Sequence, residues 1–319
     1  MVKMMSRKVL VVGSGISGVA ATELLKKQGD EVILFDGNPK LDVQALREKH
    51  PVFKDVEIIL GELPEEKMSA FDLVVLSPGV PTDIPMVCAL REKHIPIWGE
   101  IELAYQCAKG SVIAITGTNG KTTTTALVGQ IMENYFSDVK VVGNIGIPYT
   151  SVAAETTEET VTVAEISSFQ LETIHEFHPK VSAILNITPD HLNRHHTMEC
   201  YIKTKERIAE NQTADDTCVL NYEDEVLREF GSHLKTKVLY FSSRQKLENG
   251  LYLEGEDIFY HDGTKAVKVI NVNELNILGK HNYENVMAAT GMALSFGVPL
   301  EKIVEVLKRF QAVEHRIEY

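Results

Sequence analysis

The residues best suited to chemistry in this chain lie between positions 111 and 125. An apolar run typical of a buried strand breaks there into Gly-Thr-Asn-Gly-Lys-Thr at 117–122, and apolar residues then recur at helical spacing. Such a glycine turn lets backbone N–H groups converge on an anion at the positive end of a helix. Lys121 can reach a terminal phosphate, and the Thr122 hydroxyl stands where a Mg²⁺ ligand belongs. The pattern predicts a phosphate-binding loop, shorter than G-x-x-x-x-G-K-[ST]; an ordinary strand-to-helix turn is the alternative.

Polar side chains also follow two later strands. The strand expected at 160–164 ends in Glu165, a carboxylate that could hold Mg²⁺ beside the loop or could instead cap the short helix that follows. The strand expected at 181–187 leads into Asp190 and His191, which could coordinate a metal or orient metal-bound groups. We expect His195 and His196 to be surface residues.

Two helices carry further candidates, each with a structural alternative. The helix expected at 198–211 holds Lys203 and Lys205 among acidic residues, and a solvated helix face is the favoured interpretation of any single lysine there. Asn282 and Asn285 lie near the start of a later helix, where capping competes with ligand binding as their role.

A second glycine motif lies near the N-terminus. A strand at 8–12 runs into Gly-Ser-Gly-Ile-Ser-Gly at 13–18, a helix follows, and the next strand ends in Asp36. This G-x-G-x-x-G unit predicts an anionic or nucleotide ligand on the helix N-terminus without saying which, and a tight turn with no ligand is the alternative. A strand at 71–76 ends in Ser77 and Gly79, plausible contacts for the same ligand because ligands bind at the carboxyl ends of parallel strands.

Alternating strands and helices must position these groups. The alternation predicts an α/β fold in two parts: a Rossmann-like domain with a parallel sheet over 1–109, and a P-loop-type α/β central domain over 110–319. A hairpin-rich segment at 250–272 adds antiparallel strands to the second part. A chain of 319 residues is long enough for two such cores.

Composition excludes several classes of protein. A net charge of -13 argues against non-specific nucleic-acid binding. No apolar run reaches the roughly 18 residues of a membrane span, and the N-terminal apolar stretch ends in glycines, so we read it as a strand and not as a signal peptide. The four cysteines are scattered, without a metal or disulfide pattern. We therefore expect a cytoplasmic protein with reduced thiols, which binds neither nucleic acid nor a membrane.

Taken together, these segments resemble the Mur ligase family, the ATP-dependent amide ligases of peptidoglycan precursor synthesis. The resemblance covers both expected domains in the right order. The matching residues are GTNGKTT at 117–123, GNIG at 143–146, EISSFQL at 165–171, NITPDHLNR at 186–194, Lys205, GKHNYEN at 279–285, and His315 with Arg316.

The resemblance implies a role for each candidate residue, with Lys121, His191 and Lys205 catalytic. ATP would be bound by Gly117, Thr118, Asn119, Gly120, Lys121, Thr122, Thr123, Asn144, Asn282, Asn285 and Arg316. Two Mg²⁺ ions would be held by Thr122, Glu165, His191 and Lys205, the last carbamylated by CO₂ into an anionic ligand. The UDP substrate would contact Gly15, Ile16, Ser17, Gly37, Asn38, Ser77, Gly79, Ser167 and Gln170.

The activity that the resemblance implies is addition of D-glutamate to UDP-N-acetylmuramoyl-L-alanine, with ATP, through an acyl phosphate, by a monomer. Family members carry a third, C-terminal domain that binds the amino acid, and this sequence stops near its expected start, so we expect 319 residues to be incomplete for turnover. The alternatives are another family member such as the L-alanine-adding enzyme, or a Rossmann oxidoreductase that uses the first glycine motif with NAD. A non-catalytic nucleotide-binding module and the folylpolyglutamate synthases, which lack such a first domain, are further readings.

Overall fold

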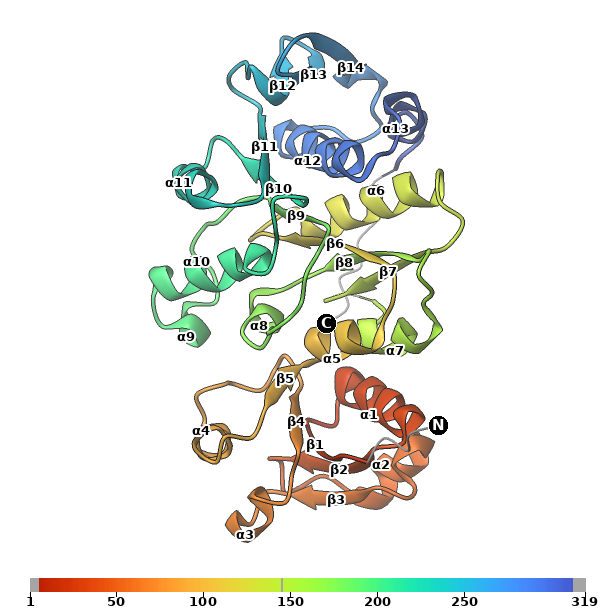
Figure 1. The fold of residues 1–319 in the computed structure, drawn as a ribbon, viewed down its shortest axis with the longest axis vertical. Coiled ribbons are helices and arrows are strands. Elements are labelled where there is room, and N and C mark those ends of the chain that lie inside the picture. The colour runs from red at the N-terminus through yellow and green to blue at the C-terminus, as the bar shows by residue number, and fades with distance from the viewer. Residues whose placement is uncertain (1–5, 145, 312–319) are drawn as a thin grey trace. The chain divides into compact units, whose positions relative to one another are not determined.

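A computed structural model describes residues 6–144 and 146–311, and these fall into two compact units (Figure 1). Unit 1 comprises the chain up to Lys109 together with Gly146–Thr157 and Phe169–Phe177. Unit 2 comprises the remaining described residues. Residues 109 and 110 lie on either side of the division between the units, and two later segments of the chain also pack into unit 1.

Unit 1 is built on sheet A, a five-stranded parallel sheet in the order β3-β2-β1-β4-β5. Its strands are β1 (Lys8–Val12), β2 (Glu31–Asp36), β3 (Glu57–Leu60), β4 (Leu73–Leu76) and β5 (Ile97–Gly99). Its helices are α1 (Ile16–Gln28), α2 (Val43–Lys49), α3 (Glu65–Met68), α4 (Pro85–Glu92), α5 (Glu100–Cys107) and α7 (Tyr149–Val152), with 3₁₀ turns at Pro51–Phe53 and Ala153–Glu155.

Local sequence explains these elements. The strands are continuous apolar runs such as LVVL, which suits strands covered on both faces. Helix α1 ends because Gly29 adopts φ 88°, and its N–H bonds the carbonyls of Leu25 and Lys26. Helix α2 is capped by Asp42, the residue before it, whose side chain accepts from the N–H groups of Gln44 and Ala45.

Two buried carboxylates of α5 fasten the later segments into unit 1. Glu100 accepts from the Thr150 N–H at 2.7 Å and its hydroxyl at 2.9 Å, at the start of α7. Glu102 accepts from three successive backbone N–H groups, those of His175, Glu176 and Phe177. These bonds satisfy N–H groups that no helix or sheet of their own pairs.

Unit 2 is built on sheet B, nine strands in the order β14-β13-β12-β11-β10-β9-β6-β8-β7. The strands are β6 (Ser111–Thr116), β7 (Val139–Gly143), β8 (Val161–Glu165), β9 (Val181–Ile184), β10 (Thr217–Asn221), β11 (Lys237–Ser242), β12 (Asn249–Glu254), β13 (Asp257–Asp262) and β14 (Ala266–Asn271). Pairing is parallel from β7 through β12 and antiparallel from β12 to β14. The predicted fold class, a parallel sheet followed by an α/β unit with added antiparallel strands, is confirmed.

The helices of unit 2 cover this sheet. They are α6 (Lys121–Glu133), α9 (Leu192–His195), α10 (Met198–Glu206), α11 (Glu225–His233), α12 (Lys280–Phe296) and α13 (Leu300–Leu307), with 3₁₀ turns at Arg207–Ala209 and Val272–Glu274; α8 (Ser168–Leu171) spans a point where the chain passes between units. Figure 1 shows α6 and α12 side by side, and their apolar faces join one core with the strands.

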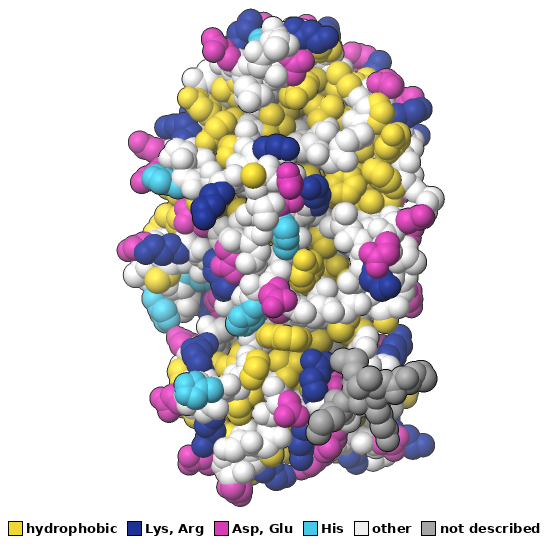
Figure 2. All heavy atoms as spheres, in the orientation of Figure 1, with side chains coloured by type: hydrophobic (Ala, Val, Ile, Leu, Met, Phe, Trp, Pro, Cys, Tyr) yellow, Lys and Arg dark blue, Asp and Glu magenta, His cyan; other side chains and the backbone are white. Residues whose placement is uncertain are grey.

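The surface carries charged side chains of both signs, as the composition leads us to expect. On the face drawn in Figure 2, acidic and basic side chains are interspersed. Among the described residues, no helix is both long enough and apolar enough to cross a membrane.

Candidate active site

The loop between β6 and α6 has the geometry of an anion cradle. Gly117 adopts φ 154° and Gly120 φ 85°, which favour glycine. A Cβ on Gly120 would lie 2.4 Å from Oδ1 of Asn285, so the start of α12 packs directly on the loop. Gly120 is the N-cap of α6 and provides no side-chain cap, so the first N–H groups of that helix face the loop without a capping oxygen.

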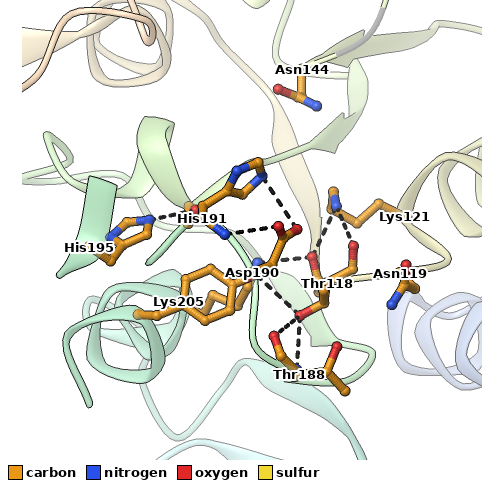
Figure 3. Close-up of polar contacts among 12 residues, drawn as sticks. Thr118, Asn119, Lys121, Asn144, Thr188, Asp190, His191, His195 and Lys205 are labelled. Carbon is orange, nitrogen blue, oxygen red and sulfur yellow. Dashed lines mark hydrogen bonds and ion pairs between the residues drawn. The ribbon is translucent and has the colours of Figure 1, made fainter. Parts of the chain in front are cut away.

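The segment after β9 holds the loop in shape. The Thr118 N–H donates to the carbonyl of Asn186 at 3.0 Å, and the Asn119 N–H donates to Oδ1 of Asn186 at 2.9 Å. Nδ2 of Asn186 returns a bond to the carbonyl of Asn119 at 3.0 Å. The Thr118 hydroxyl donates to the carbonyl of Thr188 at 3.1 Å (Figure 3). The loop is therefore preorganised by strand-end residues on its neighbour in the sheet.

Lys121 lies folded over this loop. Its Nζ donates to the carbonyls of Gly117 and Thr118, each at 3.0 Å (Figure 3). Burial lowers the pKa of Lys121, and the charges of Glu165 and Asp190 oppose that shift. The ammonium group is thus bonded to two neutral carbonyls, which an anion could replace with stronger bonds between opposite charges.

Lys205 is buried beneath the same loop, with 1% of its surface exposed. Its Nζ donates to the carbonyl of Gly117 at 2.9 Å and lies 3.4 Å from Oγ1 of Thr116. Burial, reinforced by the charge of Lys121, lowers the pKa of Lys205 to about 7. Lys203, two residues earlier, has a side chain 69% exposed. A solvated face therefore describes Lys203 and is wrong for Lys205.

The oxygen donors expected of a Mg²⁺ site lie at neighbouring strand ends. Glu165, 2% exposed, ends β8 and accepts from Nδ2 of Asn144 at 3.1 Å. The hydroxyl residue Thr122 is the second residue of α6, which follows β6, the strand that pairs with β8. Within the described ranges, no three His, Cys, Asp or Glu side chains form a metal cluster. A carboxylate and a hydroxyl nevertheless fit Mg²⁺, which takes most of its ligands from phosphates and water.

His191 differs from Glu165 and Thr122 in the exposure of its side chain and in its backbone conformation. Its side chain is 50% exposed, its Nε2 lies 3.4 Å from Oδ2 of Asp190, and its φ is 50° (Figure 3). Left-handed backbone at a non-glycine residue is uncommon and clusters at functional sites.

The prediction that His195 is a surface residue is wrong. His195 is 5% exposed, its Nε2 lies 2.9 Å from the hydroxyl of Ser168, and its ring centroid lies 5.2 Å from that of Tyr201. His196 is exposed, as predicted. The Tyr201 hydroxyl lies 3.1 Å from that of Thr118, so a residue that the sequence did not single out contacts the phosphate loop.

A cavity of about 390 Å³ opens beside the loop, large enough for part of a nucleotide. Its lining residues are Asn119, Gly120, Leu185, Asn186, Phe241, His281, Glu284 and Asn285. The capping alternative for Asn282 and Asn285 is wrong, because α12 begins after Gly279 with no side-chain cap. Asn282 instead donates to the carbonyl of Leu278 at 2.8 Å. Phe241, His281 and Glu284 were not predicted as site residues, although the last two belong to the GKHNYEN segment.

The glycine loop of unit 1 is closed by a carboxylate. Oδ2 of Asp36 accepts from the N–H of Ser14 at 3.0 Å and its hydroxyl at 2.6 Å, while Oδ1 accepts from the Asn38 N–H at 3.0 Å. Burial alone would raise the pKa of Asp36, but these bonds outweigh it and lower the pKa. Asp36 is thus engaged in shaping the loop, which leaves little capacity for the ribose hydroxyls of a dinucleotide.

Seven residues predicted for the UDP substrate lie on three adjacent strand ends of sheet A. Gly15, Ile16 and Ser17 follow β1, Gly37 and Asn38 follow β2, and Ser77 and Gly79 follow β4. Ile16 is 74% exposed, and Gly15 caps α1 without a side chain. A Cβ on Gly13 would lie 2.7 Å from Oγ of Ser77, so the β1 and β4 turns meet at the point where the strand order reverses.

The remaining predicted site residues lie in different parts of the chain. Thr123 and Ser167 are partly buried in unit 2. Gln170, 4% exposed, belongs to unit 1, where its side chain hydrogen-bonds Glu100. His315 and Arg316 lie outside the described residues.

Comparisons with known proteins find matches to the same family in both units. Residues 115–293 match the family profile of the Mur ligase middle domain, and residues 7–99 match that of the Mur ligase MurD-like N-terminal domain. The UDP-N-acetylmuramoylalanine--D-glutamate ligase of Lachnospira eligens is 59% identical over 98% of this chain and 70% of its own length. The enzyme of the same name from Lachnoclostridium phytofermentans is 55% identical over 99% of this chain and 69% of its own.

Solved structures share the fold at low identity. A murein peptide ligase from Psychrobacter arcticus aligns with TM-score 0.62 and 16% identity, over 98% of this chain and 70% of its own. The UDP-N-acetylmuramate:L-alanyl-gamma-D-glutamyl-meso-diaminopimelate ligase of Neisseria meningitides aligns with TM-score 0.61 and 16% identity, over 97% of this chain and all of its own.

Proposed function

The chain belongs to the Mur ligase family, and we propose that it serves the ATP-dependent addition of D-glutamate to UDP-N-acetylmuramoyl-L-alanine in peptidoglycan precursor synthesis. The identity of 59% to a ligase of that name, over nearly the whole chain, supports this activity. The observation that carries the assignment of the ATP site is the pair of lysines, Lys121 and Lys205, whose ammonium groups both donate to the carbonyl of Gly117 in the glycine loop.

In the reaction, the L-alanine carboxylate attacks the γ-phosphorus of ATP, an O–P bond forms, and the bond to the bridging oxygen breaks to release ADP. The amine of D-glutamate then attacks the acyl phosphate, losing a proton as the amide forms and phosphate leaves. The loop N–H groups and Lys121 bind and orient the phosphates, which is the larger part of catalysis in phosphoryl transfer. Lys121 leaves the carbonyls of Gly117 and Thr118 when phosphate arrives. The cavity bounded by Asn285 and its neighbours takes the rest of the nucleotide, with Asn144, Asn282 and Arg316 as further ATP contacts.

Two Mg²⁺ ions complete the proposed site and, when bound, neutralise the crowded phosphate oxygens. Thr122 and Glu165 would hold one ion, and His191 with carbamylated Lys205 would hold the other. Lys205 suits carbamylation because a buried amine with a pKa of about 7 is partly unprotonated near neutrality. Its Nζ lone pair forms the bond to the carbon of CO₂, one C=O electron pair moves to oxygen, and Nζ releases a proton. The product is an anion, which Lys121 would favour as strongly as it disfavours the ammonium form.

The UDP-substrate is proposed to bind in unit 1, across the β1 and β4 strand ends. The diphosphate would lie on the uncapped N-terminus of α1 at Gly15 and Ser17. Ser167 and Gln170 are proposed contacts of the muramoyl part. The engagement of Asp36 within its own loop gives the oxidoreductase alternative no support. We propose that the protein is a cytoplasmic monomer. Its partners are then its three substrates, UDP-N-acetylmuramoyl-L-alanine, D-glutamate and ATP.

Titration calorimetry of the 319-residue chain tests the proposal. We expect UDP-N-acetylmuramoyl-L-alanine and Mg²⁺-ADP each to bind, and NAD not to bind. Tighter binding of UDP-N-acetylmuramate than of its L-alanyl derivative would instead favour an L-alanine-adding ligase. NAD binding without the other two ligands would overturn the proposal.

The chain spans about 70% of the length of the relatives that it matches. We propose that a polypeptide of these 319 residues binds both ligands without completing ligation. A coupled phosphate-release assay with all three substrates would contradict this if it recorded full turnover.

A further inference from the structure

Tyr201 is the largest buried group near the phosphate loop to which the reaction assigns no role. It lies on α10 with 1% of its surface exposed, four residues before Lys205 and so on the same face of the helix. A buried tyrosine on a helix face is ordinarily a core residue, and its hydroxyl then needs a hydrogen-bond partner. Here that partner belongs to the phosphate loop, and the ring faces a cation.

The Tyr201 ring contacts two neighbouring side chains, those of Lys205 and His195. Nζ of Lys205 lies 4.8 Å from the ring centroid, within cation–π range, and the His195 ring lies 5.2 Å away at a tilt of 48°. His195 is in turn bonded to Ser168. Attraction to the ring face offsets part of the cost of placing a buried lysine beside Lys121. The position of Lys205 therefore depends on a ring that is itself held in place.

Counting hydrogens fixes the direction of the hydroxyl bond. The Thr118 hydroxyl donates its one hydrogen to the carbonyl of Thr188, at 3.1 Å, and accepts from the Thr188 N–H at 3.0 Å. Its second lone pair faces the Tyr201 hydroxyl at 3.1 Å, so Tyr201 is the donor. Thr118 then has every bond that a hydroxyl can make, and loss of the Tyr201 hydroxyl would leave it one short.

We propose that Tyr201 is a positioning residue of the phosphate site, its ring holding the Lys205 ammonium group in place before carbamylation and its hydroxyl fixing Thr118 in the loop. One rigid side chain thereby links the lysine on α10 to the shape of the cradle between β6 and α6. The link to catalysis rests on the proposed function, whereas the link to Lys205 rests on the contacts alone. The two halves of the side chain can be removed separately, so each has its own variant.

The first test measures the accessibility of Lys205 and needs no ligand. The 319-residue chain is treated with acetic anhydride in CO₂-free buffer, and the acetylation rate of Lys205 is followed by mass spectrometry. We expect Tyr201→Leu, which removes the ring, to raise that rate about tenfold or more, and Tyr201→Phe, which keeps the ring, to leave it near the wild-type rate. The matched control is Tyr252→Leu, because Tyr252 is also 1% exposed, also lies in unit 2 and also faces a lysine, Lys246. Equal Lys205 rates in wild type and in a folded Tyr201→Leu would overturn the proposal.

The second test measures the hydroxyl through nucleotide affinity. We expect Tyr201→Phe to weaken Mg²⁺-ADP binding about fivefold, since one neutral hydrogen bond to the loop is lost, whereas Tyr252→Phe should leave that affinity unchanged. Wild-type affinity in Tyr201→Phe would overturn the role of the hydroxyl. Absence of ADP binding by the wild type would count against the proposed function instead, and the Lys205 rates would still decide whether Tyr201 positions that lysine.

Discussion

Two glycine loops in this molecule share one layout and differ in what closes them. Each follows a buried parallel strand, β1 or β6, and each precedes a helix whose N-cap glycine provides no side-chain bond. In unit 1 the loop is closed by the carboxylate of Asp36, which accepts a loop N–H. In unit 2 it is closed by the ammonium group of Lys121, which donates to two loop carbonyls. The glycines are thus alike, while the charges placed on the loops are opposite.

Under the proposed function, this difference separates a loop that only binds a diphosphate from a loop at which a phosphoryl group is transferred. Backbone N–H groups at a helix N-terminus suit a diphosphate whose charge stays constant, and a nearby carboxylate can be tolerated there. Transfer of a phosphoryl group crowds several anionic oxygens together, and the loop that does this needs movable positive charge. A glycine motif therefore identifies an anion site, and the charged partners of the loop distinguish its chemistry.

The strongest test of this comparison is to damage each loop separately. A Cβ on Gly18 would lie 1.9 Å from the carbonyl of Gly13, and a Cβ on Gly120 would meet Asn285 at a φ of 85°. We expect Gly18→Ala to abolish UDP-substrate binding, by about a thousandfold or more, and to leave Mg²⁺-ADP binding intact. Gly120→Ala should do the reverse. Calorimetry with both ligands measures the two effects.

Gly15→Ala is the control for folding, because no atom lies within 4 Å of its Cβ position. It should unfold at the wild-type temperature, and any loss of UDP-substrate would then report close approach of the ligand to the backbone. If Gly18→Ala and Gly120→Ala each lost both ligands equally, the two loops would not be separate sites.

The next effect in size concerns the charge on the second loop. Removal of the ammonium in Lys121→Ala should weaken Mg²⁺-ADP binding about thirtyfold, roughly 2 kcal/mol, since charge-assisted bonds to phosphate are lost. UDP-substrate affinity should be unchanged. Lys203→Ala removes an equal charge from the exposed face of α10 and should alter neither affinity. Similar losses of ADP binding in the two variants would mean that only net charge matters.

The sequence predicts both loops because their signals are local. Strand, glycines, lysine and hydroxyl occur within about fifteen residues at 111–125, and backbone conformation there is dictated by neighbours in the chain. The strand and helix types elsewhere follow from the same periodicity. The fold class, the loops and the strand-end positions of Glu165 and Ser77 are predictable in this way.

What the sequence does not predict depends on packing between distant segments. Lys203 and Lys205 lie two residues apart and so on opposite faces of α10, but only the packing of that helix shows which face is buried. The burial of His195 and the contact of Tyr201 with Thr118 depend on how α9 and α10 meet the loop. The return of residues 146–157 and 169–177 to unit 1 depends on Glu100 and Glu102, glutamates that by composition alone would be assigned to the surface.

The smallest expected effect extends the comparison from loops to buried carboxylates. In unit 2, Asp216 is 3% exposed and accepts from His178 at 2.6 Å and from the Thr213 N–H at 2.7 Å. Burial alone would raise its pKa, but these bonds outweigh it and lower the pKa to about 2. In unit 1, burial dominates over the hydrogen bonds from Thr150 and raises the pKa of Glu100. The two carboxylates therefore respond to pH with opposite signs.

The stability that Asp216 contributes is present above its ordinary pKa of 3.8 and is lost as pH falls toward about 2. Glu100 binds its proton more tightly in the folded chain, so its contribution falls as pH rises above 4.5 and is not lost in acid. We expect Asp216→Asn to lower the free energy of unfolding of unit 2 at pH 7 by about 1–2 kcal/mol, and the difference from wild type to shrink near pH 2. Urea titrations at both pH values, with loss of ADP binding reporting unit 2 and loss of UDP-substrate binding reporting unit 1, measure it. A difference that persists unchanged at pH 2 would show that Asp216 acts through its shape and not its charge, and the two units would then not differ in how they use buried carboxylates.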